Sequence, residues 1–401
     1  MLYEQASKTM NIGYLHVGPQ EHGLHRYGRL IAEEAKTRAN DSVIETRAAL
    51  NQSWWQNLVT LHQASQKLAD ADVVHFQYNK AIWGETLSVL NLFIFALSCK
   101  AALAVTLHDV YWEQVPFQWS KLVFYFKAMY GPKALAIRFL IHRMEKVFVC
   151  TQQELDRLVS VSNLQTKAKE KVKIIPHFVE RRDIQINPED VRKSLDLKNK
   201  RIITLLGWIH PRKGHRILVE ALPKLPSNVM VVFAGQNSKD SGGEQFLQEL
   251  TQLAKTLKVA DRIRITGYLS EKELEEYLIA TDIAVCPFMK CSASGSLSTW
   301  ISISHPRVAA YKLPQIEEYN GLSPDSIHTF HPYNANALAE LLINLLSQPQ
   351  DTNNTAIDHL RSQLQISAIV DEHIQNYTQA IHRQDPKDSK FNSSKQSFQS
   401  L

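Results

Sequence analysis

The residues best suited to chemistry form a short basic loop in the second half of the chain. Residues 207–214 read GWIHPRKG, follow the apolar run 202–206, and precede a helical pattern. His210, Arg212 and Lys213 bring positive or polar groups to a helix N-terminus, where backbone N–H groups also attract anions. The loop therefore suggests a site for a phosphate-bearing ligand, although basic residues and glycine also occur in ordinary surface turns.

A serine-rich turn is the second candidate anion site. Ser294, Gly295 and Ser296 precede an apolar stretch that should be helical to about Ile303. Serine caps a helix start, and the remaining backbone N–H groups can bind a diphosphate without any side-chain charge. A capped helix without a ligand is the alternative. We favour the ligand interpretation if this turn shares a sheet edge with Lys213.

Glycines also follow two other apolar runs of the second half. Gly235 follows 229–234, and Gly267 with Tyr268 follows 263–266. Glycine permits close approach of backbone to a ligand, but it also simply ends strands.

Histidines lie near strand ends in the first half of the chain. His108 directly follows the apolar run 102–107, where its ring could position an acceptor hydroxyl or stabilise charge near neutral pH. A lone histidine is more often structural. We prefer His108 because its strand is the clearest buried run; the other histidines in comparable positions are His16, His22, His25 and His75. Their spacing gives no metal-binding pattern, so no metal is expected.

The elements that must position these residues alternate between strand and helix. In the first half we predict strands over 11–17, 73–76 and 102–107, with helices over about 26–38 and 87–99. In the second half we predict strands over 202–206, 229–234, 263–266 and 283–286, with helices over 215–225, 244–257 and 271–280. Short Val- and Ile-rich runs alternating with helices predict an α/β fold of two doubly wound parallel sheets.

Length and composition support two domains. A chain of 401 residues with 44% hydrophobic content can bury two cores. We predict a disordered arm over 1–10, a first domain over 11–185, a second domain over 186–383, and a disordered tail over 384–401. The hinge is expected near 176–200, with the active cleft between the domains.

Charge and cysteine content limit the function classes. A net charge of +5 is too small to predict nucleic-acid binding, and the four cysteines lack zinc-site spacing. Reduced thiols, no evident secretory leader and a longest apolar run of only 87–98 predict a cytoplasmic protein that does not span a membrane.

One segment, 117–147, could lie on an anionic membrane surface. It interleaves aromatic residues with six cations and a single carboxylate, Glu145. The cations are Lys121, Lys127, Lys133, Arg138, Arg143 and Lys146. An amphipathic segment of this kind binds anionic lipid, but a core helix with a solvated basic face is equally consistent with it.

The order of the motifs resembles GT-B glycosyltransferases of the family 4 type, also called glycosyl transferases group 1. The second half carries the resemblance through GWIHPRKG at 207–214, VVFAG at 231–235, IRITGYLS at 263–270 and ATDIAVCP at 280–287. The first half agrees more loosely through 23–27, 105–109 and 174–177. The resemblance covers roughly residues 11–350.

This resemblance implies two Rossmann-like domains that face each other across a cleft. The second would bind a nucleotide-sugar, which is a substrate, so no cofactor is implied. Lys213 matches the family's phosphate-binding lysine. The other implied donor-binding residues are His210, Arg212, Gly235, Gly267, Tyr268, Ser294, Gly295 and Ser296. His108 would act beside the transferred sugar, and Gly23, His25 and Asp109 would lie on the acceptor side.

The implied reaction is hexosyl transfer to a glycan or lipid-linked acceptor, as in polysaccharide biosynthesis, with retention of configuration and without a metal. Two departures leave an alternative open. Trp208 stands where the family usually has an arginine, and residues 292–299 lack the family's two donor-site glutamates. A non-catalytic GT-B protein that binds a nucleotide or a partner is therefore the rival interpretation, and a GT-B phosphorylase or epimerase is a weaker one.

Overall fold

The protein is represented by a computed structural model, which describes residues 9–20, 22–38, 42–50, 53–108, 132–162, 170–180, 182–237, 242–289, 294–349 and 354–382. Its contacts divide the chain into two compact units. The first unit comprises Met1–His177 and Ile366–Leu401, and the second comprises Phe178–Gln365.

The first unit is built on a six-stranded parallel sheet. Its strands are β1 (Asn11–Val17), β2 (Ser42–Ala48), β3 (Val73–Tyr78), β4 (Ala102–Leu107), β5 (Lys146–Val149) and β6 (Val172–Ile174), in the order β2-β1-β3-β4-β5-β6. All residues of β3 and β4 are buried, as expected for central parallel strands covered on both faces. The strands predicted over 11–17 and 102–107 are confirmed.

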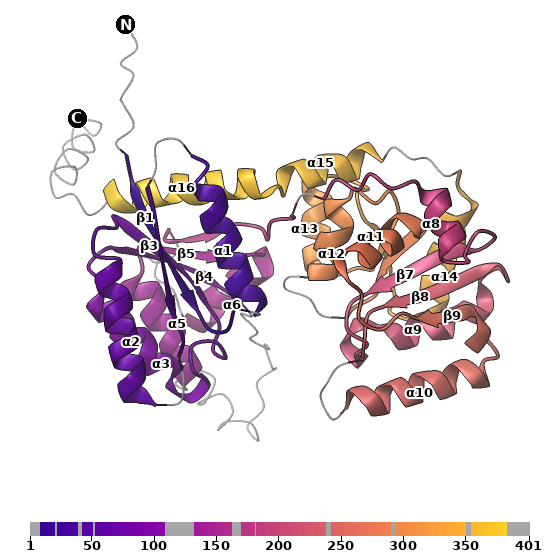
Figure 1. Cartoon of the computed structure of the whole chain (residues 1–401), viewed down its shortest axis with the longest axis horizontal. Coiled ribbons are helices and arrows are strands. Elements are labelled where there is room, and N and C mark those ends of the chain that lie inside the picture. Colours follow the sequence, from indigo (N-terminus) through magenta and orange to yellow (C-terminus); the bar gives the residue numbers. More distant parts are fainter. Residues whose placement is uncertain are drawn as a thin grey trace, which may run out of the picture. The chain divides into compact units, whose positions relative to one another are not determined.

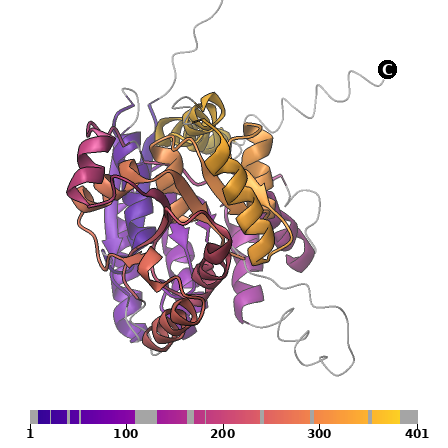
Figure 2. The same ribbon diagram turned by 90° about the vertical axis from the view of Figure 1, so that its right-hand side faces the viewer.

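Helices cover both faces of this sheet (Figures 1 and 2). They are α1 (Gly23–Ala35), α2 (Trp54–Lys67), α3 (Ser88–Ser98), α5 (Pro132–Arg143), α6 (Gln152–Ser162) and α16 (Ile366–His382), with a 3-10 turn η1 (Glu85–Leu87). Side chains of β3 alternate between the faces. Phe76 packs on Phe95 of α3, whereas His75 packs on Tyr377 of α16. The helix predicted over 87–99 is buried on one face only, since Leu97 is 76% exposed.

The second unit repeats the architecture. Its strands are β7 (Arg201–Leu206), β8 (Val229–Ala234), β9 (Ile263–Ile265), β10 (Ile283–Cys286), β11 (Val308–Tyr311) and β12 (His328–Phe330), all parallel in the order β12-β11-β10-β7-β8-β9. The two sheets confirm the predicted α/β class and its doubly wound form.

Helices of the second unit again lie on both faces of the sheet. The α-helices are α8 (Pro188–Ser194), α9 (His215–Ala221), α10 (Gly243–Thr256), α11 (Glu271–Ala280), α12 (Gly295–Ser302), α13 (Pro314–Leu322), α14 (Ala335–Ser347) and α15 (Thr355–Gln363), and the 3-10 turns are η3 (Pro211–Lys213), η4 (Leu222–Lys224) and η5 (Ala260–Arg262). Phe233 joins a core with α9, α10 and α14, while its neighbour Val232 joins a core with α8 and α11. Side-chain alternation along β8 thus separates two cores.

The boundary between the units differs from the sequence prediction. The second unit starts at Phe178 rather than at 186, and α16 belongs to the first unit instead of extending the second to 383. Polar as well as apolar contacts hold α16 on the first unit. Lys146 of β5 donates hydrogen bonds to Asn376 and Gln379 of α16, at 3.1 and 2.9 Å. Such pairing between residues 230 positions apart has no signature in local sequence.

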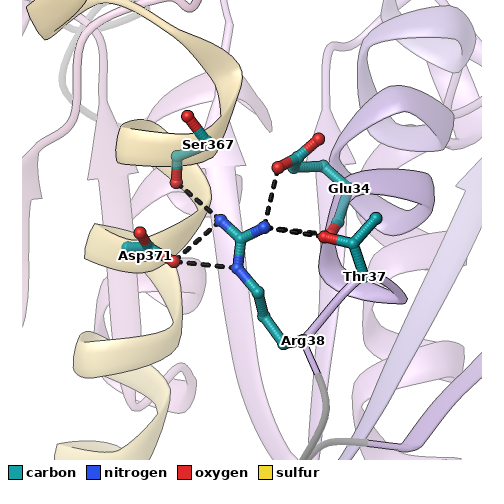
Figure 3. A network of polar contacts seen from close by, with 5 residues as sticks. All are labelled: Glu34, Thr37, Arg38, Ser367 and Asp371. Carbon is teal, nitrogen blue, oxygen red and sulfur yellow. Dashed lines mark hydrogen bonds and ion pairs between the residues drawn. The ribbon is translucent and has the colours of Figure 1, made fainter.

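Arg38 adds a second link between α16 and the rest of the first unit (Figure 3). Its guanidinium donates to the Asp371 carboxylate and the Ser367 carbonyl of α16, each at 2.9 Å, and to Glu34 at the end of α1, at 2.7 Å. Burial acts to lower the pKa of Arg38, but the hydrogen bonds that it donates to Glu34 and Asp371 outweigh this effect, and the pKa rises.

Candidate functional site at the carboxyl ends of the strands

Strand order places the ligand edge of the second unit between β7 and β10. The chain passes from β7 to β8 and β9 on one side, and β10, β11 and β12 lie on the other. Loops that leave neighbouring parallel strands in opposite directions open a crevice at the strand carboxyl ends, where ligands of such sheets bind. The basic loop 207–214 follows β7, and the turn 294–296 follows β10. Both predicted anion sites therefore lie at one switch point.

The basic loop runs beside the loop that follows β8. The N–H of Gly207 donates to the Ala234 carbonyl at 3.0 Å, and the N–H of Ile209 donates to the Gln236 carbonyl at 2.9 Å. Gly235 is needed because a Cβ there would lie 2.2 Å from the Gly207 carbonyl oxygen. This glycine thus holds two loops together at the sheet edge.

Gly214 holds the other side of the basic loop against the loop after β10. It has φ +83°, and a Cβ at this position would lie 2.2 Å from the Pro287 carbonyl oxygen. Beside it, Lys213 Nζ lies 5.8 Å from the centre of the Phe288 ring, a cation–π distance. The loop after β10 therefore contacts the lysine ammonium.

His210 and Arg212 complete the basic loop in different ways. His210 is the N-cap of η3, and its Nδ1 accepts from the N–H of Arg212 at 3.2 Å. The Arg212 side chain is exposed, whereas His210 and Lys213 are half-buried. The histidine shapes the turn, so positive charge at this edge comes from Arg212 and Lys213.

Ser294 caps α12, as the sequence predicted. Its Oγ accepts from the N–H of Leu297 at 3.3 Å and lies 2.9 Å from the Ser296 hydroxyl. The N–H groups of Gly295 and Ser296 belong to the first helical turn, which has no intrahelical acceptors for them. Backbone donors and the helix dipole there favour a negatively charged ligand.

Gly267 and Tyr268 lie further along the same edge. They follow β9, which β8 separates from β7, a step of about 10 Å across two strand spacings. Gly267 has φ +74°, and Tyr268 is 77% exposed. A contact joins the two loops, since the Gly235 N–H donates to Thr266 Oγ1 at 3.1 Å. The sheet therefore brings these residues to the ligand edge without packing them on Lys213.

His108 lies at the strand carboxyl ends of the first unit. Its N–H donates to the Tyr78 carbonyl at 3.0 Å, and its Nε2 lies 2.8 Å from Gln77 Oε1. The Tyr27 ring packs edge-on against the imidazole, with ring centres 5.2 Å apart. Burial, followed by the charges of His177 and His22, lowers the pKa of His108 to about 3. The ring is half-buried and neutral at physiological pH.

The acceptor-side residues are placed on α1 or fall outside the description. Gly23 is the first residue of α1, and the His25 ring centre lies 5.4 Å from that of His16. His16 Nε2 lies 2.8 Å from the Glu45 carboxylate, a hydrogen bond, and burial lowers the pKa of His16 below its usual value. Asp109 lies outside the described residues.

His75 is not at this edge. It is fully buried inside the sheet, with Nε2 2.8 Å from Thr106 Oγ1 and Nδ1 2.6 Å from the Tyr377 hydroxyl. Burial and the nearby His373 lower its pKa well below the usual value. Its role is structural.

Sequence reasoning missed two neighbours of His108. Gln77 orients the imidazole, and Tyr27 packs on both His108 and His177. The available signal was the pair of polar residues His75 and Gln77 inside the otherwise apolar run 73–78, because buried polar side chains need a partner.

Part of the segment 117–147 is described, and two of its cations are structural. Lys146 is 1% exposed, and Arg143 donates to the Ala96 carbonyl at 3.0 Å. Residues 117–131 lie outside the described residues. In the described part of the chain, no helix is long and apolar enough to cross a membrane. The same residues contain no group of three or more His, Cys, Asp or Glu that could hold a metal ion.

The two parallel sheets, each with a switch point and helices on both faces, define the GT-B fold class. Several solved structures share this fold over nearly the whole chain. Anabaena HepE in complex with UDP is 15% identical and covers 92% of this chain and 100% of its own, with a TM-score of 0.67. A glycosyltransferase from Rickettsia africae is 17% identical and covers 93% and 99%, with a TM-score of 0.68.

Residues 187–359 match the family model described as glycosyl transferases group 1. The match lies within the second unit and agrees with the motifs there, and it spans less than half of the chain. A GDP-mannose-dependent alpha-(1-6)-phosphatidylinositol monomannoside mannosyltransferase from Mycobacterium tuberculosis is 27% identical over 138 residues. The matched segment spans 34% of this chain and only 34% of that relative.

Proposed function

We propose that the protein is a glycosyltransferase that moves a sugar from a nucleotide-sugar donor to a glycan or lipid-linked acceptor. The observation that carries the proposal is the convergence of Lys213 and the α12 N-terminus at the β7–β10 switch point. The group 1 match spans both elements. Similar proteins add support, since one was solved in complex with UDP and another is named as GDP-mannose-dependent.

In this proposal the second unit binds the donor diphosphate. The Lys213 ammonium and the N–H groups of Gly295 and Ser296 face an anion whose charge grows as the sugar leaves. Donors that are already oriented toward the developing charge stabilise the transition state more than the ground state. These fixed donors provide charge compensation, so we propose metal-independent transfer.

The first unit contributes a neutral imidazole. With its pKa lowered to about 3, His108 is uncharged at neutral pH and can hydrogen-bond a sugar hydroxyl. Gln77 at 2.8 Å restrains the ring. Retention of anomeric configuration and a peripheral cytoplasmic location are further parts of the proposal, and the lipid acceptor is supported by the phosphatidylinositol in the name of one relative.

The rival function is nucleotide binding without transfer. It is favoured by Trp208, which is 48% exposed where the family usually has an arginine, and by the absence of glutamate from 292–299. Both features leave much of the donor's recognition to Lys213 and backbone N–H groups.

A panel of UDP- and GDP-sugars separates the two functions. We expect one nucleotide class to raise the unfolding temperature, because a ligand that binds only the folded state stabilises it by mass action. We also expect slow release of the nucleoside diphosphate from that donor, measured by chromatography or by phosphate detection after an added nucleoside diphosphatase. Binding without release or transfer to any glycan or lipid acceptor would support the rival, and no binding at all would contradict both.

A further inference from the structure

A second cationic feature of the second unit lies at the amino-terminal end of β7, opposite the carboxyl ends of the strands. It is a surface hollow of about 580 Å³. Its lining residues are Arg192, Lys198, Asn199, Lys200, Arg201, Leu346, Ser347, Gln348 and Pro349. Arg201 is the first residue of β7, and the candidate donor loop follows Leu206, the last. Five steps of about 3.3 Å place these ends about 17 Å apart. The hollow is therefore separate from the donor edge.

The lining of the hollow is strongly positive. Four of its nine described lining residues are lysine or arginine, and none of the nine is a carboxylate. Backbone carbonyls that would repel an anion are engaged elsewhere, since Arg307 donates to the carbonyl oxygens of Gln348 and Pro349. The surface offered to a ligand is one of cationic donors.

A single buried carboxylate, that of Asp282, pairs with both arginines of the hollow, Arg192 and Arg201. Asp282 has a fully buried side chain and lies 3.0 Å from both Arg192 Nη2 and Arg201 Nε. Its Oδ2 also accepts from the N–H of Ile202 at 2.7 Å. One carboxylate thus orients two guanidinium groups and neutralises only one of them.

Arg201 also has an unsatisfied donor. Its Nη2 is buried and has no hydrogen-bond partner among the described residues. A buried donor without a partner is costly, and buried polar groups in folded proteins nearly always have one. Because this atom has almost no accessible surface, an oxygen of a ligand in the hollow reaches it only when the Arg201 side chain turns toward the hollow.

We propose that this hollow binds a phosphorylated small molecule. Guanidinium groups match phosphate oxygens in geometry as well as charge, and two exposed lysines add point charges. The volume falls within the range of about 300–1,000 Å³ typical of small-molecule sites and exceeds what one phosphate ion needs. Leu346 and Pro349 supply apolar contact for the organic part of the ligand.

Calorimetric titration with pyrophosphate at physiological salt tests the proposal. The wild-type protein is expected to bind two equivalents, one at each edge of the second unit. The Lys198→Gln/Lys200→Gln variant spares the arginines that hold Asp282, and both lysines are exposed, so it should fold normally. It should lose one site or weaken it about a hundredfold, because each lost charge-assisted contact costs about a factor of ten. Lys213→Ala should lose only the other site.

Lys255→Gln/Lys272→Gln is the matched control, because both lysines are exposed and the change in net charge is the same. It should keep both sites. Equal weakening in this control would show a general ion atmosphere and overturn the proposal, as would unchanged binding in Lys198→Gln/Lys200→Gln. This measurement needs no sugar transfer. The proposal for the hollow can therefore be contradicted while the proposed function stands, and the proposed function can be contradicted while the hollow still binds pyrophosphate.

Discussion

The two sheets present different chemistry at equivalent edges. At the β7–β10 edge, glycines allow backbone atoms of neighbouring loops to meet, as Gly214 does with Pro287 and Gly235 with Gly207. At the equivalent edge of the first unit, side chains dominate: His108 is held by Gln77 and Tyr27. The β7–β10 edge of the second unit is thus built from backbone and fixed positive charge. The equivalent edge of the first unit is built from neutral rings.

This difference separates two tasks. Close-packed backbone with oriented N–H groups suits a diphosphate, whose recognition depends on charge and on donors that do not move. A neutral, half-buried imidazole suits hydroxyl groups, which are recognised by hydrogen bonds rather than by charge. The same fold therefore supports both roles because loop residues, not the sheets, differ.

The largest expected effect comes from breaking the backbone contact at Gly214. In Gly214→Ala, φ of +83° and a Cβ at 2.2 Å from the Pro287 carbonyl oxygen force the loop to shift. We expect about 3 kcal/mol of destabilisation in urea unfolding and loss of nucleotide binding. Gly321→Ala in α13 is the control: nothing lies within 4 Å of its Cβ, so stability should change by about 1 kcal/mol or less. Equal behaviour of the two variants would contradict the account.

The stability of both units should depend on pH, because each contains a buried histidine. His373 of α16 and His215 of α9 are fully buried, and burial lowers the pKa of each to about 3. The unfolded chain binds a proton below about pH 6.5 that the folded chain cannot bind until about pH 3, so stability falls as pH falls through that window. Each histidine should contribute about 2 kcal/mol of loss between pH 6.5 and 5.

His373→Phe and His215→Phe should each remove one proton from this pH dependence, measured by urea unfolding at pH 7 and 5. An unchanged slope in both variants would refute the burial argument. A change in only one would show which unit limits acid stability.

The smallest effect is expected at the surface link of α16 shown in Figure 3. Asp371 pairs with Arg38, but its side chain is 58% exposed, and exposed ion pairs contribute about 0–1 kcal/mol. Asp371→Asn should therefore change the free energy of unfolding by less than about 1 kcal/mol. A loss above about 2 kcal/mol would show that the ion pair, rather than the buried contacts of Tyr377 and Lys146, holds α16 on the sheet.

Local sequence predicted the strands well where all residues are apolar. The runs 102–107 and 229–234 match β4 and β8 in full, because central parallel strands need apolar side chains on both faces. It did not predict β2, whose sequence SVIETRA reads as polar because the strand lies at the sheet edge.

The candidate site was predicted where its residues lie in local sequence motifs. Gly214 and Ser294 lie in local motifs, a strand exit and a helix cap, which short windows reveal. Gln77 acts on a residue 31 positions away, and α16 returns to the first unit through Tyr377 and His75, 302 positions apart. Pairings of this range are set by topology and cannot be read from a local pattern.

The most direct test of the central claim is nucleotide-sugar binding and turnover by Lys213→Ala beside Lys312→Ala. Lys312 is an exposed lysine of the same unit that pairs with Glu317 at 3.2 Å, outside the β7–β10 loops. We predict that Lys213→Ala weakens donor binding at least tenfold and abolishes turnover, because one charge-assisted contact to phosphate is worth about 1.5–3 kcal/mol. Lys312→Ala should match the wild type. Undiminished donor binding and turnover in Lys213→Ala would contradict the assignment of the diphosphate to this edge.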